Sequence, residues 1–260
     1  MMKRGRAVLL GAVGVVGALV LWELISRLGI VSELSLPPAS TVLERLAKEL
    51  GRSATWTATA ITLMQAVVSI VLCTVIAVPL GILIGRVPAV DRYTRSTIDF
   101  LRAMPGIALV PLFLLFIGAT SEMVIFLASF AAIWPLLIQV IEGARSVEEL
   151  ALNMARGYRL SRGRQFFRVV LPATMPSIVT GLRLATTVAL LVSIGAGLLS
   201  GAPGVGQLIA VANVNADGLG VFAFSLWSGV LGIAVLTVLR VTEGRLLAWH
   251  YARVQMERAA

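Results

Sequence analysis

The sequence predicts an all-α membrane protein with six transmembrane helices and with both termini in the cytoplasm. The chain is 58% hydrophobic and 13% charged, and its mean hydropathy is +0.94. A soluble domain could not cover that much apolar surface, because soluble chains are about half apolar and one quarter charged. Uncharged runs of spanning length also recur between short polar intervals. Together these features predict a multi-pass integral membrane protein.

The first predicted unit, residues 1–56, consists of one span and a short external helix. The stretch 1–6 is basic and 7–22 is apolar, which is also how a secretory signal peptide begins. No A-x-A cleavage site follows and the apolar run continues past Glu23, so we favour a retained span.

The external helix is predicted to start after Pro37 and Pro38, where Thr41 and Glu44 form a capping pair. Its amphipathic pattern is typical of a helix that lies along the membrane surface. The expected apolar stripe is Val42, Leu43, Leu46, Ala47 and Leu50.

The core unit, residues 57–245, is expected to hold five further spans. We place them at 57–85, 98–118, 123–141, 178–199 and 221–239. The first of these contains Gly81 and Gly85, a G-x-x-x-G pair that favours close helix packing but is also common by chance in apolar segments. A basic turn with Arg86, Arg92 and Arg95 follows it, and a cytoplasmic tail is expected over 246–260.

The distribution of lysine and arginine predicts the orientation, since these residues are retained on the cytoplasmic side of membranes. With the amino terminus inside, six spans place nearly every basic residue inside as well. The exceptions, which lie outside, are Arg27, Arg45, Lys48 and Arg52.

A long charged interval at 142–176 is expected to form a helical hairpin on the inner side. Ser146 and Glu149 have the form of a capping box, Gly157 can end the helix, and Ser161 can cap a second, short helix before a boundary at Pro172. One apolar stripe is predicted on the first helix: Val147, Leu150, Ala151, Met154 and Tyr158. The hairpin is interpreted as a docking piece for a partner protein, or as a helix packed on neighbouring spans.

The same interval carries a family resemblance. Asn153-Met154-Ala155 is followed after three residues by Arg159 and, nine residues later, by Val169-Val170-Leu171-Pro172. It resembles the cytoplasmic loop of permease subunits of bacterial ATP-binding-cassette importers, which reads E-A-A, three residues, G, nine residues, I-x-L-P. Asn153 stands in place of the acidic residue and Arg159 in place of the glycine.

Further segments extend the resemblance over nearly the whole chain. They are LPPAS at 36–40, RAMPGIALVPL at 102–112, PSIVTGLRLA at 176–185 and GAPGVGQLI at 201–209. They are similar to the branch that imports sulfonates, taurine, nitrate and similar small solutes, and also vitamin or pyrimidine precursors. The resemblance implies a type I importer permease fold with a coupling loop at 143–176, in the bacterial cytoplasmic (inner) membrane.

The resemblance also implies partners: a second permease copy in a homodimer, two ATP-binding subunits and an external solute-binding protein. ATP and Mg would be bound by the ATP-binding partner, with no cofactor or metal in this chain. The external helix at 42–50 either receives the solute-binding protein or is a simple interfacial linker. The residues implied in coupling to the ATPase are Leu150, Ala151, Asn153, Met154, Ala155, Arg156, Gly157, Tyr158, Arg159, Leu171 and Pro172.

Catalysis by this chain alone is not expected. A P-loop needs a lysine that follows glycine, and the only lysines are Lys3 and Lys48. His250 and Cys73 are each the sole residue of their type, which leaves no triad, metal cluster or disulfide framework to build. The net charge of +9 is explained by membrane orientation rather than by nucleic-acid binding.

A self-sufficient carrier or channel remains the alternative function, and a structural or assembly protein a weaker one.

The solute pathway is expected where proline and glycine interrupt spans, because exposed backbone is tolerated in a membrane only along a cavity or within packed protein. Ordinary helix packing explains the same residues equally well. The candidates are Met104, Pro105, Gly106, Ser193, Gly195 and Gly197. Arg102 and Arg183 are further pathway candidates, as residues that flank an inner gate for anions, and snorkelling to the membrane interface is the favoured alternative for both.

Overall fold

The computed structural model describes residues 2–32 and 35–246, and every regular element in those ranges is helical. The predicted tail at 246–260, with His250, therefore lies almost wholly outside the described residues. The elements are α1 (Met2–Arg27), α2 (Ala39–Leu50), α3 (Ser53–Arg86), α4 (Pro88–Ala103), η1 (Gly106–Leu109), α5 (Val110–Ile117), α6 (Ser121–Arg145), α7 (Glu149–Gly157), α8 (Arg162–Gln165), η2 (Phe166–Val170), α9 (Leu171–Ser200), α10 (Val205–Val214) and α11 (Gly218–Leu246).

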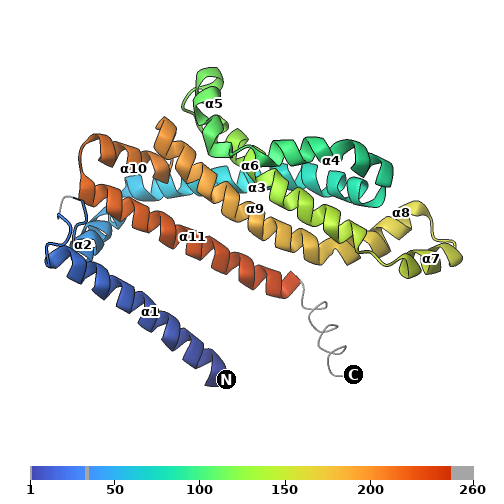
Figure 1. The fold of residues 1–260 in the computed structure, drawn as a ribbon, viewed down its shortest axis with the longest axis horizontal. Helices are drawn as coiled ribbons and strands as arrows, with labels where there is room; N and C mark the ends of the chain where they lie inside the picture. The colour runs from blue at the N-terminus through green and yellow to red at the C-terminus, as the bar shows by residue number, and fades with distance from the viewer. Residues whose placement is uncertain (1, 33–34, 247–260) are drawn as a thin grey trace.

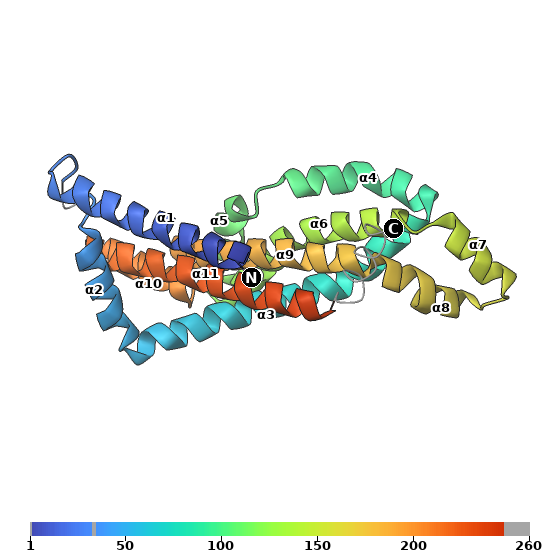
Figure 2. The ribbon, with the colours of Figure 1, turned by 90° about the horizontal axis from the view of Figure 1, so that it is seen from below.

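Three long helices, α3, α6 and α9, pack side by side and form the centre of the molecule (Figure 1). α11 runs along α9 and α10, while α1 contacts the rest mainly through α2. α2 lies at one end of the long axis, and α7 and α8 lie at the opposite end (Figure 2). The predicted all-α architecture is confirmed over the described residues.

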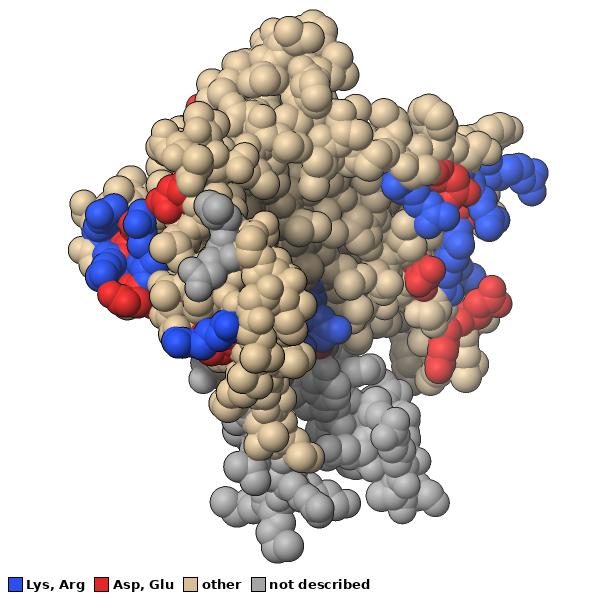
Figure 3. Space-filling model, turned by 60° about the vertical axis from the view of Figure 1, so that its left-hand side comes forward, with Lys and Arg blue, Asp and Glu red and all other residues tan. Residues whose placement is uncertain are grey.

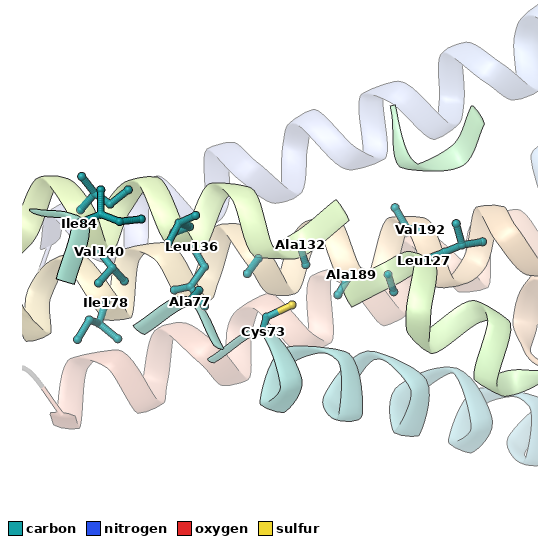
Figure 4. Packing of buried hydrophobic residues seen from close by; sticks show 14 of the residues in the cluster. Cys73, Ala77, Ile84, Leu127, Ala132, Leu136, Val140, Ile178, Ala189 and Val192 are labelled. Atoms are coloured by element: carbon teal, nitrogen blue, oxygen red, sulfur yellow. The ribbon is translucent and has the colours of Figure 1, made fainter. Parts of the chain in front are cut away.

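The core between the three central helices is built largely from small and branched apolar side chains (Figure 4). Fully buried small residues such as Ala77, Ala132 and Ala189 allow the helix backbones to approach closely. Without a strong hydrophobic force between helices in lipid, this close packing supplies much of the association energy.

The G-x-x-x-G pair of α3 is one of these contacts. A Cβ on Gly81 would lie 2.7 Å from Val140 Cβ, and one on Gly85 would lie 2.6 Å from the carbonyl oxygen of Ile141. Gly143 of α6 faces Ser177 of α9 in the same way, at 2.4 Å. Glycines therefore line both faces of α6 where its neighbours cross it.

Four stretches are long and apolar enough to cross a membrane: Ser53–Arg86, Ser121–Arg145, Arg162–Val214 and Gly218–Gly244. These four stretches are counted among the described residues only, and α1, the predicted first span, is not one of them. The number of six spans therefore stays a prediction. The span expected at 98–118 is interrupted between α4 and η1, and it adds a fifth crossing if the two bent parts form one span. The chain bends by 76° between α4 and η1, at a site where Pro105 has no N–H to continue a helix.

The expected basic turn at 86–95 is also wrong, because Pro88 starts helix α4 there. Proline is favoured at the first helical position, where an N–H would have no partner. Figure 3 shows charged side chains in separate groups on the face in view, with a wide uncharged surface between them.

The predicted capping pair of α2 is wrong as well. The helix begins at Ala39, and the Thr41 hydroxyl donates to the Pro38 carbonyl at 2.7 Å instead of capping. Of the expected stripe, Val42 and Leu46 are buried but Leu43 is exposed.

Ion pairs connect α2 to residues 215–217, which join α10 to α11. Arg45 bonds Asp217 at 2.7 Å and Glu49 at 2.9 Å. Glu49 also pairs with Arg52 at 3.0 Å, and only 4% of its side chain is exposed. A buried carboxylate with two guanidinium partners is well compensated, so breaking this cluster is expected to loosen α2.

Candidate functional site

The segment formed by α7, the turn 158–161 and α8 projects beyond the central helices at one end of the molecule (Figures 1 and 2). It joins α6 to α9, two of the three central helices. A force applied to it would therefore reach two helices that pack directly on one another.

The predicted capping box at Ser146 and Glu149 is wrong. Ser146 ends α6 rather than starting α7: its N–H donates to the Glu142 carbonyl, and its hydroxyl donates to the Gly143 carbonyl at 3.0 Å. Glu149 still lies in the first turn of α7, where a negative charge is favoured by the helix dipole.

The two faces of α7 differ sharply. Leu152 and Ala155 are buried, each 5% exposed. Leu150, Met154 and Tyr158, spaced four residues apart, are 67%, 56% and 78% exposed. We call these three residues the α7 stripe. Large apolar side chains grouped on a projecting segment are typical of a partner contact.

The other residues of the predicted hairpin stripe are less accessible. Val147 is buried and precedes α7, which begins at Glu149, so its expected place in the stripe of this helix is wrong. Ala151 is partly exposed. Ala155 points into the protein, where it can hold α7 in position but has little surface for a partner. Asn153 and Arg156 are exposed and lie within hydrogen-bond reach, 3.3 Å from Arg156 Nη1 to Asn153 Oδ1.

The C-terminus of α7 is a Schellman motif. The N–H of Leu160 donates to the Ala155 carbonyl at 3.1 Å, and the N–H of Arg159 donates to the Arg156 carbonyl at 2.8 Å. Arg159 has a φ of 52°, the left-handed conformation that this motif requires and that favours glycine. α7 ends at Gly157, as predicted, and Arg159 is the residue just beyond the cap that takes the left-handed conformation. Arg159 is also the position where the importer loop pattern has glycine.

Arg159→Gly is expected to raise the free energy of unfolding by about 1 kcal/mol relative to Arg159→Ala, because only glycine escapes the left-handed penalty. The two variants both lack the arginine side chain, so their difference isolates the backbone effect. The measurement is thermal unfolding of the purified protein. An Ala variant as stable as the Gly variant would contradict the assignment.

The second half of the segment runs continuously into α9. Residues 162–200 form α8, the π-helical turn η2 and α9 without a break, so the boundary expected at Pro172 is only the first turn of α9. Pro172 has no N–H to donate to the Arg168 carbonyl. The N–H of Leu171 donates to the Phe166 carbonyl, five residues earlier, which is the hydrogen bond of a π-helical turn. Leu171 and Pro172 are both partly buried.

The two glycine-containing pathway segments meet in the structure. Gly106 packs on Ala131 of α6, and Ile107 reaches Gly195 of α9, 3.2 Å from where a Cβ would lie. A cavity of about 370 Å³ is lined by Ile107, Gly195 and residues of α11. Met104 and Pro105 form the break next to Gly106.

The remaining pathway candidates lie elsewhere. Gly197 packs on α10, and the buried Ser193 hydroxyl has no hydrogen-bond partner among the described residues. Arg102 pairs with Asp99 of its own helix at 3.0 Å. Arg183 lies 3.6 Å from Glu243 of α11, a contact that residue spacing in the sequence does not reveal.

The family model described as binding-protein-dependent transport system inner membrane component matches residues 77–248. The taurine transport system permease protein TauC of Escherichia coli is 29% identical, over 89% of this chain and 86% of TauC. The bicarbonate transport system permease protein CmpB of Synechocystis is 30% identical, over 80% of this chain and 77% of CmpB.

Among solved structures, a chain of the inward facing MetNI methionine ABC transporter superposes with a TM-score of 0.63. The match covers 75% of this chain and 94% of that chain, at 18% sequence identity. At this identity the similarity shows a shared fold, that of a type I importer permease.

Proposed function

This chain belongs to the family of binding-protein-dependent transport system inner membrane components, and from that premise we propose how it works. It is a multi-pass subunit of the bacterial inner membrane and the permease of an ATP-binding-cassette importer. Separate subunits hydrolyse ATP, and the permease converts their closure into movement of its spans. In this proposal the permease chain itself catalyses no reaction.

The exposed α7 stripe is the observation that supports this coupling. It lies within the loop whose spacing matches the importer pattern, on a segment joined to two central helices. In the proposal, Leu150, Met154 and Tyr158 enter an apolar groove of the ATP-binding subunit, as amphipathic helices do in groove-type recognition. Arg156 and Asn153 contribute polar contacts at the rim.

The proposed assembly contains two copies of this chain, two ATP-binding subunits and an external solute-binding protein. The solute is a small anion of the sulfonate, taurine, nitrate or bicarbonate type, in keeping with the transport systems for which TauC and CmpB are named. ATP and Mg are bound by the ATP-binding subunits.

Reconstitution into liposomes tests the proposal. With the proposed ATP-binding subunit and solute-binding protein added, radiolabelled taurine, nitrate or bicarbonate is expected to accumulate only when ATP is supplied. The matched control replaces the P-loop lysine of the ATP-binding subunit with alanine, because that lysine contacts the phosphates. Solute flux driven by an ion gradient through the permease alone would favour a self-sufficient carrier.

A further inference from the structure

A cavity of about 390 Å³ lies between the end of α3 and the helices α7, α8 and η2. Its apolar wall includes Ile82 and Leu83 of α3, with Phe166 and Val170 of η2 opposite. This volume is within the range of small-molecule sites, about 300–1,000 Å³. The α3 side continues into exposed apolar surface, since Leu83 is 49% exposed.

Three arginines from three different elements line the same cavity: Arg86, Arg156 and Arg162. No carboxylate is among its described lining residues. Arg86 donates only to the Ala144 carbonyl, at 3.4 Å, and Arg162 has no ion pair or side-chain hydrogen bond among the described residues. Elsewhere arginines such as Arg45 and Arg145 pair with aspartate.

The cavity thus combines a cationic rim with an apolar wall. Guanidinium groups bind phosphate through paired, charge-assisted hydrogen bonds. In the orientation predicted by the positive-inside rule, this end of α3 lies at the cytoplasmic leaflet, which holds anionic lipids. Basic pockets between helices on that side are suited to phospholipid headgroups.

We propose that this cavity binds the phosphate headgroup of an anionic phospholipid, with an acyl chain lying along the exposed apolar side of α3. The bound lipid would connect α3 to α8 through Arg86 and Arg162, and so hold the α7–α8 segment against the central helices. The inference uses the orientation predicted from the positive-inside rule but not the ATPase coupling of the proposed function, so the two can fail separately.

The test is native mass spectrometry of the purified full-length chain in detergent, titrated with phosphatidylglycerol or with phosphatidylcholine of the same acyl chains. Phosphatidylglycerol is expected to bind more tightly. Arg86→Gln combined with Arg162→Gln is expected to weaken its binding by about thirtyfold, at roughly 1 kcal/mol per basic residue. The single variant Arg162→Gln, which removes an exposed side chain without a partner, is expected to weaken it about fivefold.

The matched control is Arg95→Gln combined with Arg164→Gln, which removes two arginines outside the cavity. It is expected to keep the wild-type affinity. An equal loss in this control would overturn the proposal in favour of diffuse surface attraction. Inorganic phosphate that binds as tightly as the lipid would overturn it in favour of a free-anion site. Complete displacement of the lipid by the ATP-binding subunit would assign the cavity to that partner instead.

Discussion

Leu150→Asp combined with Met154→Asp is expected to abolish co-purification of the ATP-binding subunit and, with it, ATP-driven uptake. Both side chains are more than half exposed, so the substitutions should leave the fold of this chain intact. In a docked complex they would place two carboxylates in an apolar groove, and truncation of a single interface hot spot already costs about 2–4 kcal/mol. The expected loss of affinity is therefore at least a hundredfold, measured by co-purification and by permease-stimulated ATP hydrolysis.

The matched control is Val214→Asp at the end of α10, which makes the same kind of change at a residue that is 84% exposed. α10 lies at the opposite end of the molecule from α7 (Figure 1). This variant is expected to keep the ATP-binding subunit. Unchanged association in the double α7 variant would refute the coupling role of the α7 stripe.

Gly206→Val is expected to prevent accumulation of folded protein. A Cβ at this position would lie 2.1 Å from the Ile194 carbonyl oxygen and 2.6 Å from the Leu198 backbone nitrogen. Both contacts are backbone atoms of α9, which cannot rotate away as a side chain would. The cost is expected at or above the usual range of overpacking, about 1–3 kcal/mol.

The preceding loop cannot relieve that contact, because it is tethered to α3. Val205 N–H donates to the Thr62 hydroxyl at 2.9 Å, and Gln65 Nε2 donates to the Pro203 carbonyl at 2.9 Å. Gly204 has a φ of 139°, a conformation that again favours glycine. The GAPGVGQLI segment is thus explained by its packing between α3 and α9.

Gly229→Val of α11 is the control, since no described atom beyond the adjoining backbone of its own helix lies within 4 Å of a Cβ built there. It should reach the wild-type yield and elute as a single peak in size-exclusion chromatography. A Gly206 variant with the yield and melting temperature of this control would contradict the close packing of α10 on α9.

Local patterns predicted several contacts that the structure bears out. Gly81 and Gly85 were ambiguous as a motif, yet both lie where α3 crosses α6. The loop spacing placed Arg159 at the glycine position, and its left-handed φ supplies the physical reason for that preference. Periodicity alone could not separate Leu150 and Met154, which are exposed, from Val147, which is buried. All three fit one predicted stripe, but Val147 lies in the connection between α6 and α7, and only the tertiary structure decides where α7 begins.

Composition and charge distribution determined by themselves that this is a helical membrane protein and how it is oriented, because apolar spans and arginine placement depend on solvent and lipid rather than on specific contacts. The continuous course from α8 into α9 and the Arg183–Glu243 contact were decided only by the tertiary structure. Each depends on which helices become neighbours. That choice is made by packing between residues far apart in the chain, and local sequence contains no direct record of it.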